Sequence, residues 1–314
     1  MPDGILIIDK PAGWTSHDVV ARVRRILKEK RVGHTGTLDP FATGVLVTLV
    51  GRATRLAQFL SGAEKEYEAN IRLGYATDTG DLTGARRVDA SVAVDCATLV
   101  RAQIEEAFAR LRGEIEQTPP MYSAKKVGGK KLYELARRGE EIERKAVRVR
   151  ISVFEILDRE DGAFFTHNED GTCDVRARVV CSAGTYVRVL AESVGAALGT
   201  GAHLAALRRT RAGEFRIESA VALEALQQLV EADAGAKFLI PPEAALPHLP
   251  SAHLRGETAR RVRHGAAVPA EAPHGWEDGA HVLMFDDRGD LLAVGVYDAL
   301  RGLLQPRVML AVEK

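Results

Sequence analysis

Hydrophobic and polar positions follow two different periods along this chain. The apolar run at residues 5–8 and the Pro-Gly turn after it predict a short strand. Apolar residues with helical spacing follow at residues 19–27 and predict a helix, which Thr15 or Ser16 could cap. Alternating spacing follows at residues 66–74, which predicts a strand with one apolar face. The positions that share the helical face are Val19, Val20, Val23, Ile26 and Leu27, and those that share the strand face are Tyr67, Ala69, Ile71 and Leu73.

Further segments extend this mixture of strands and helices. The run VLVTLV at 45–50 predicts a buried strand, and residues 52–62 and 97–115 each predict a helix, the second ending near Gly113. Residues 174–199 read as a strand, a tight turn at Gly184 and a helix. No regular alternation of strand and helix is present, so the pattern indicates an α+β fold. The stretch 164–174, FFTHNEDGTCD, predicts a surface hairpin.

The composition changes after residue 237. Four prolines between residues 241 and 250 predict a linker, and the chain beyond reads as short strands joined by tight turns. One hairpin turn is expected at residues 287–290, DRGD. We therefore expect a main domain over residues 1–240 and a small β-rich domain over residues 250–314.

Charge and cysteine content narrow the possible functions. The 314 residues carry 43 Lys and Arg against 43 Asp and Glu, so a nucleic-acid role has to rest on local patches. The three cysteines form no C-x-x-C pair, which indicates neither a zinc site nor a disulfide framework. No signal peptide and no membrane-spanning run is evident. We expect a protein of the reducing cytoplasm with no metal.

One glycine-rich loop carries a single carboxylate. In residues 31–51, RVGHTGTLDPFATGVLVTLVG, Asp39 precedes a proline and an apolar strand. A surface turn capped by Asp39 is the simplest interpretation, and the pattern alone favours it. A phosphate cradle fits less well, because no Lys-Ser or Lys-Thr follows and the loop leads into a strand. The third interpretation makes Asp39 a nucleophile or base, which needs a nearby cation and an apolar wall.

Candidates for these supporting roles lie elsewhere in the chain. Arg188 could be the cation, and it stands two residues after Tyr186 at a strand-turn-helix junction; it could also be an ordinary polar residue of a helix start. Tyr67 could pack in the core or offer a flat ring to a base. His34 could act in chemistry, as a stacking wedge or as a turn residue.

The segment 121–150, called the basic segment below, has ten Lys and Arg against four Glu. Two tyrosines are interleaved with these charges. A solvated helix face would also carry such charges, but in a chain of zero net charge the local excess favours contact with an RNA backbone.

Six stretches together resemble the TruB family of tRNA pseudouridine-55 synthases. They are GILIIDKPAGWTSHDVV, RVGHTGTLDPFATGVL, KEYEANIRLGYATDTGDLTG, QTPPMYSAKKVGGKKLYELARRGE, CSAGTYVRVLAESVG and HLAALRRTRAGEF, in the family's order. The resemblance implies the pseudouridine-synthase fold, α+β around a mixed, mainly antiparallel sheet, with the basic segment as a thumb-like RNA-binding insertion. The C-terminal part is similar to a small PUA-type RNA-binding domain. Ala183 stands where the family often has lysine.

The resemblance also implies roles for individual residues. Asp39 is expected to be the catalytic aspartate, with Arg188 as its partner and Tyr67 as the ring against the target base. His34 is expected to help evict that base. Asp39 could attack C1′ or take a proton from C2′, and the sequence leaves both open. The residues expected to bind the substrate RNA are His34, Tyr186, Lys125, Lys126, Lys130, Lys131, Leu207 and Arg208. The arginines of LRRTR at 207–211 and of LRGETARRVR at 254–263 are expected to contact the RNA backbone.

The implied reaction isomerises uridine 55 in the T-loop of tRNA, by flipping the base, cleaving its glycosidic bond, rotating the uracil and rejoining it through C5. It needs no cofactor. The partner is the tRNA T-arm stem-loop, and we expect a monomer with no obligatory protein partner and no membrane contact. Three other functions stay open at this stage: an RNA chaperone, a dyskerin-like synthase that needs a guide RNA, and a glycosidase that releases free base.

Overall fold

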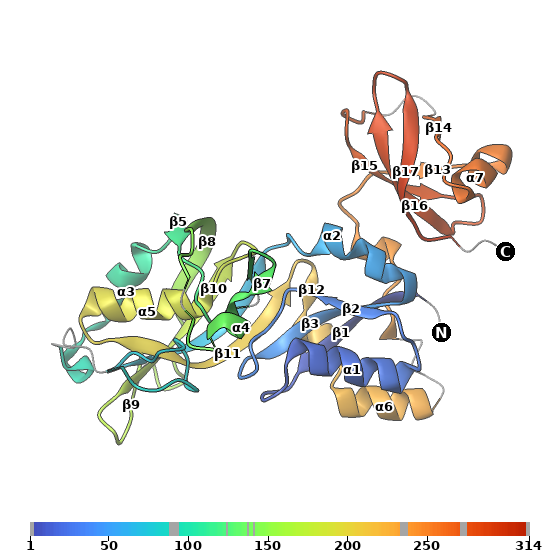
Figure 1. Ribbon diagram of the computed structural model, residues 1–314. Coiled ribbons are helices and arrows are strands. Elements are labelled where there is room, and N and C mark those ends of the chain that lie inside the picture. The colour runs from blue at the N-terminus through green and yellow to red at the C-terminus, as the bar shows by residue number, and fades with distance from the viewer. Residues whose placement is uncertain are drawn as a thin grey trace.

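The computed structural model describes residues 3–87, 94–123, 125–136, 138–140, 142–232, 238–270 and 275–311. Most of its strands belong to one long sheet (Figure 1), with the order β1-β3-β11-β4-β10-β8-β5, while β2, β12 and β9 pair with β3, β11 and β10 at its sides. These strands are β1 (Gly4–Lys10), β2 (Val32–Thr35), β3 (Thr43–Val50), β4 (Lys65–Leu73), β5 (Gly113–Gln117), β8 (Val147–Ile156), β9 (Thr166–His167), β10 (Cys173–Cys181), β11 (Ala202–Ala212) and β12 (Phe215–Arg216). The pairing of β11 with β3 is parallel and its pairing with β4 is antiparallel. The prediction of an α+β fold around a mixed, mainly antiparallel sheet is therefore confirmed.

Helix α1 (Ser16–Leu27) covers one end of this sheet. Thr15 caps it, because its side chain accepts a hydrogen bond from the backbone N–H of Asp18 while the Asp18 carboxylate accepts one from the backbone N–H of Thr15. The apolar face of α1 packs with α6 (Leu223–Glu231) against Leu6 and Ile8 of β1. Because side chains alternate along a strand, Ile5 and Ile7 point to the opposite face of the sheet.

The other end of the sheet is covered by α3 (Arg101–Ala109) and α5 (Val187–Leu198), which pack on β4, β8, β10 and β11. The helix expected over 97–115 is shorter than predicted. Asp95 caps a separate 3-10 turn, η2 (Cys96–Thr98), and β5 already begins at Gly113. The helix expected over 52–62 is also divided, into a 3-10 helix η1 (Gly51–Leu56) and one α-helical turn α2 (Ala57–Leu60).

One glycine allows the two halves of the sheet to join. Gly44 in β3 pairs with Arg209 in β11, with a φ of 98°. A Cβ atom at position 44 would lie 2.2 Å from the Arg209 carbonyl oxygen, so only glycine fits this crossing. The glycines of the loop at 31–51 thus serve in part to bring β11 beside the Asp39 loop.

The C-terminal module, residues 250–311, has its own sheet with the order β13-β15-β16-β17-β14 and one helix. Its elements are β13 (Ser251–His253), α7 (Gly256–Arg263), β14 (Val268–Pro269), β15 (His281–Phe285), β16 (Leu291–Asp298) and β17 (Leu303–Met309). The turn expected at residues 287–290 joins β15 to β16, and Gly289 has the positive φ that it requires. The hairpin expected at 164–174 joins β9 to β10.

The linker predicted from the prolines at residues 241–250 is folded and packed. The segment forms a 3-10 turn, η5 (Glu243–Ala245), and Leu246 after it is fully buried between the main sheet and the C-terminal module. Leu283, Val308 and Leu310 of the module join that same core. The connection is therefore packed against both parts.

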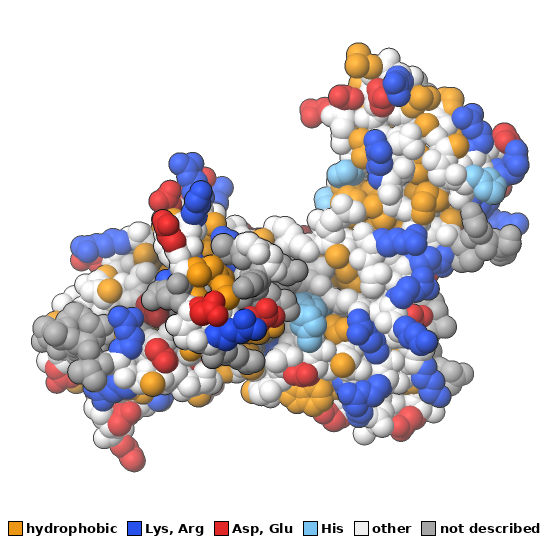
Figure 2. Space-filling model, in the orientation of Figure 1, with side chains coloured by type: hydrophobic (Ala, Val, Ile, Leu, Met, Phe, Trp, Pro, Cys, Tyr) orange, Lys and Arg blue, Asp and Glu red, His pale blue; other side chains and the backbone are white. Residues whose placement is uncertain are grey.

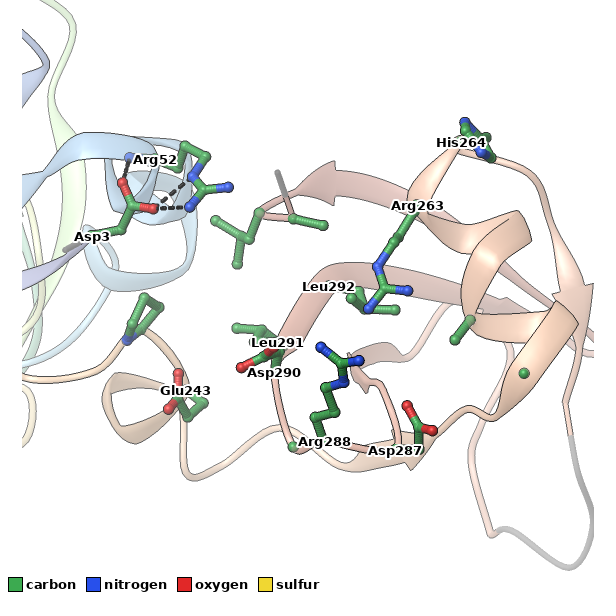
Figure 3. A pocket seen from close by; sticks show the side chains of 16 residues that line it. Asp3, Arg52, Glu243, Arg263, His264, Asp287, Arg288, Asp290, Leu291 and Leu292 are labelled. Atoms are coloured by element: carbon green, nitrogen blue, oxygen red, sulfur yellow. Dashed lines mark hydrogen bonds and ion pairs between the residues drawn. The ribbon is translucent and has the colours of Figure 1, made fainter. Parts of the chain in front are cut away.

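A cleft of about 1110 Å³ separates η1 from the C-terminal module. Figure 3 shows Asp3 and Arg52 paired on one wall and Arg263 and Arg288 on the other. Its lining carries three arginines and four carboxylates, so side chains of both charges face the cleft.

Candidate active site

The loop between β2 and β3 holds Asp39 in a fixed position. The backbone N–H of Gly13 donates to the Pro40 carbonyl at 2.8 Å, and the Ser16 hydroxyl accepts from the Leu38 N–H at 2.9 Å. The Lys10 ammonium is fully buried and donates to the carbonyls of Pro11, Trp14 and Pro40. The loop therefore has little freedom, because partners on both sides of Asp39 are fixed.

Arg188 in the first turn of α5 faces Asp39. Its Nε lies 2.9 Å from Asp39 Oδ2, and one terminal nitrogen lies 3.3 Å from Oδ1, which makes a two-point contact. The same guanidinium donates to the carbonyls of Thr79 and Tyr122, and it lies 3.6 Å from Asp81. Only 5% of the Arg188 side chain is exposed, so this arginine is a buried, fully partnered cation.

The surroundings of Asp39 affect its charge in opposite directions. Burial raises the pKa of this carboxyl above its usual value, Arg188 lowers it, and the carboxylate of Asp81 raises it again. The net pKa shift is upward. The carboxylate is still reachable, because 35% of its side chain is exposed. Asp39 is thus a poorly solvated carboxylate aimed by an arginine at an open pocket.

The pocket in front of Asp39 has a volume of about 390 Å³, within the range of small-ligand sites. Tyr67 of β4 and Leu207 of β11 supply apolar surface to it, and both are almost fully buried. Burial raises the pKa of the Tyr67 phenol, while the neighbouring Arg209 guanidinium opposes the shift. The phenol is accordingly protonated at neutral pH.

The basic segment reaches the same pocket. It contains β6 (Lys126–Val127), β7 (Lys130–Lys131) and α4 (Leu132–Ala136), and Figure 1 shows this hairpin and helix over the middle of the molecule. Ser123 and Lys125 line the pocket together with Asp39. Tyr186 lines it as well, and its backbone N–H donates to the Gln117 side chain at 3.0 Å. The pocket is therefore built from the loop after β2, from β4 and β11, from the start of α5 and from the basic segment.

Models of known protein families match most of the chain. Residues 24–187 match the TruB family pseudouridylate synthase N-terminal domain, and residues 188–247 match the tRNA pseudouridylate synthase B C-terminal domain. This chain belongs to the TruB family.

Relatives and solved structures agree with that membership. The tRNA pseudouridine synthase B of Geobacillus thermodenitrificans is 44% identical over 97% of this chain and 98% of its own. That of Solibacter usitatus is 41% identical over 98% of this chain and 100% of its own. A chain in the structure of an H/ACA RNP bound to a substrate RNA containing 2′-deoxyuridine superposes with a TM-score of 0.71 at 27% identity, covering 98% of this chain and 85% of that one.

Two residues expected to bind RNA in a TruB protein lie outside the pocket lining. His34 is half-buried in β2, not in a turn, and its ring meets that of His17 edge-on at 5.4 Å. Burial and His17 lower the pKa of His34 to about 4, so its imidazole is neutral at pH 7. Arg208 makes an ion pair with Asp9 at 2.8 Å and remains 40% exposed. The backbones of Lys126, Lys130 and Lys131 form the β6–β7 hairpin, but their side chains lie outside the described part of the structure.

The expectation that the arginines of 207–211 contact an RNA backbone is wrong for Arg209. This side chain is only 1% exposed, because it donates to the carbonyls of Val45 and Gly36 beneath the Asp39 loop. Arg211 pairs with Glu64 at 2.8 Å. Arg209 therefore supports the loop from below.

Sequence reasoning did not predict the burial of four charged residues at this TruB site: Lys10, Lys65, Asp81 and Arg209. Burial lowers the pKa of Lys10 to about 8, while the nearby Asp39 opposes the shift. The signal for Lys10 was a lysine two residues after the apolar run at 5–8, and for Asp81 a carboxylate within a Thr- and Gly-rich turn. Neither sequence pattern indicates that the side chain is buried; only the folded structure shows this.

The described residues contain no group of three His, Cys, Asp or Glu side chains placed to hold a metal ion. Within the same residues, no helix has the length and apolar character needed to cross a membrane.

Proposed function

We propose that this chain is a stand-alone tRNA pseudouridine synthase that converts uridine 55 of the T-loop to pseudouridine. The observation that supports this most strongly is the two-point contact between Arg188 and Asp39 at the wall of a pocket that Tyr67 also lines. A carboxylate held in this way beside an apolar pocket suits chemistry at the anomeric carbon of a ribose.

Pseudouridine formation breaks the bond between N1 of uracil and C1′ and makes a new bond between C5 and C1′. C1′ becomes electron-poor as the base departs, so a carboxylate beside the sugar stabilises the transition state. Asp39 acts there, either by adding to C1′ or by taking the C2′ proton. A substrate deuterated at C2′ separates the two routes, because only proton abstraction gives a primary isotope effect.

The detached uracil has to turn without leaving the enzyme. Tyr67 and Leu207 provide apolar walls for it, and water is excluded where they close over the ring. The Tyr67 phenol, kept protonated by burial, donates a hydrogen bond to the base, and it accepts the C5 proton as its own proton passes to N1, which has lost its bond to C1′. Arg209 beside the phenol lowers the cost of that exchange.

RNA binding has to offset the cost of flipping the target base, a few kcal/mol. Lys125 at the pocket, the exposed Arg208 and the C-terminal module are the proposed contacts. Figure 2 shows further Lys and Arg side chains gathered over the part of the molecule where α1 and α2 lie. Although the chain has zero net charge, its positive side chains are therefore unevenly distributed over the surface.

The proposal is tested by incubating the purified chain with unmodified tRNA and with an isolated T-arm stem-loop, followed by chemical mapping of pseudouridine. We expect one modified position, in the T-loop, on both RNAs. Release of free uracil would indicate a glycosidase. Modification only after a guide RNA is added would replace the stand-alone proposal, and refolded but unmodified tRNA would indicate an RNA chaperone.

A further inference from the structure

An exposed tryptophan lies beside the catalytic loop without a role in the mechanism above. Trp14 is 36% exposed, in the turn between β1 and α1. It lines no part of the Asp39 pocket, and among the described aromatic contacts it has no ring partner. A single exposed apolar side chain is ordinary in itself, but an indole in this turn keeps a flat apolar face open to a ligand.

The turn that carries Trp14 is bound to the Asp39 loop. One ammonium, that of Lys10, contacts both the Trp14 carbonyl at 2.6 Å and the Pro40 carbonyl at 3.2 Å. Gly13 and Ser16, on either side of Trp14, make their own hydrogen bonds to Pro40 and Leu38. The backbone at Trp14 is therefore held at a fixed distance from the catalytic carboxylate.

Other rings border the same region. His17, in the first turn of α1, is exposed and meets His34 edge-on. His34 lies two residues before Gly36, which lines the pocket. Rings from two separate segments, α1 and β2, thus meet close in sequence to Trp14 and to the pocket-lining Gly36.

We propose that Trp14 is a stacking platform for an RNA base that neighbours the flipped uridine. Removing one base from a folded loop leaves the bases on either side without their stacking partner, and an exposed indole offers them a flat apolar face. Because the turn is already fixed to the Asp39 loop, the platform also positions the RNA relative to the carboxylate. This inference rests on the proposed function and adds an RNA-positioning residue to it.

Fluorescence tests the contact directly, because the chain has only two tryptophans, Trp14 and Trp276. Trp276 belongs to the core of the C-terminal module, where its ring lies 5.8 Å from that of Tyr297. A Trp276→Phe variant, first shown to retain turnover, leaves Trp14 as the sole emitter. Saturation with T-arm RNA should quench its emission strongly. Unchanged emission at saturation would overturn the proposal.

A coupling experiment separates stacking from a merely structural role. Trp14→Ala should weaken T-arm binding by about five- to thirty-fold, and Trp14→Phe should restore most of the affinity. Phe238→Ala is the matched control, because Phe238 is 40% exposed but lies near the opposite end of β1. The Phe238→Ala variant should bind T-arm RNA with the affinity of the wild type.

The loss caused by Trp14→Ala should vanish on an RNA that carries an abasic nucleotide at the stacked position. The abasic nucleotide is placed in turn at each position of the T-loop. If Trp14→Ala lowers the affinity for all of these RNAs equally, stacking is refuted. These binding results do not depend on turnover. If the Trp276→Phe variant modifies tRNA while Trp14→Ala weakens binding equally on intact and abasic RNA, this inference is removed and the proposed function stays intact.

Discussion

Replacing Arg188 by lysine tests how the site is held together, since it keeps the positive charge and removes the planar fork. Arg188 serves four groups at once: the carboxylates of Asp39 and Asp81, and the carbonyls of Thr79 and Tyr122. A lysine has three donors on a single nitrogen and cannot spread them over that arc. We therefore expect the two carbonyls to lose their partner.

The size of the effect follows from burial. Each buried acceptor left without a donor costs about 1–3 kcal/mol, so the loss of both partners in Arg188→Lys should lower the free energy of unfolding by about 2–6 kcal/mol. That is a large share of the 5–15 kcal/mol typical of a folded protein. The two-point contact that aims Asp39 is lost as well. A displacement of the carboxylate by about 1 Å would reduce the rate of the chemical step on the order of a hundred-fold.

Urea unfolding and single-turnover kinetics measure the two effects separately. Arg178→Lys is the control, because Arg178 also bridges two carboxylates, those of Glu66 and Glu155, but is 39% exposed. We expect that variant to change stability by less than about 1 kcal/mol. If Arg188→Lys matched the wild type in both stability and single-turnover rate, the guanidinium would not be what fixes Asp39.

Other predictions concern charge and proton transfer. Burial raises the pKa of Asp39, and the reaction needs the ionised carboxylate. The single-turnover rate should therefore increase with pH in a titration curve whose midpoint lies above about 3.9, the usual pKa of an aspartate. A rate that stays constant down to pH 4 would argue against this. A carboxyl whose pKa is raised by folding destabilises the folded state once it is ionised, and this cost is relieved as the pH falls below the raised pKa. Asp39→Asn should therefore not lower the free energy of unfolding at pH 7. A lower free energy of unfolding in urea would refute this prediction. Tyr67→Phe keeps the ring and should slow a proton-transfer step, and unchanged single-turnover rates would remove the relay. Lys125→Gln should reduce the slope of log affinity against log salt by about 1, and an unaltered slope would place Lys125 outside the interface.

Local sequence patterns predicted most of the fold. The alternation in β4 and the helical spacing in α1 are strong because each element buries a single face. Boundaries failed where side-chain hydrogen bonds decide them, as at Asp95, whose carboxylate caps the start of the separate 3-10 turn before α3. Leu246 was placed in a linker because prolines surround it, whereas tertiary packing buries it.

The site was predictable only in part, for a physical reason. Asp39 stands out by its loop, Tyr67 and Arg188 were candidates among several alternatives, and the motif resemblance assigned them their roles. Lys10 and Arg209 could not be found in this way, since a lysine or arginine in sequence reads as a surface residue. Both are buried because backbone carbonyls of the Asp39 loop accept from them, and those carbonyls converge only in the folded chain.

The central claim is that the ionised Asp39 carboxylate acts on the ribose of a flipped uridine. Single-turnover mapping of pseudouridine on unmodified tRNA with the Asp39→Asn variant, alongside its affinity for the same RNA, tests this most directly. The account predicts RNA binding close to that of the wild type and no product. Pseudouridine formed at the wild-type rate by this variant would contradict it.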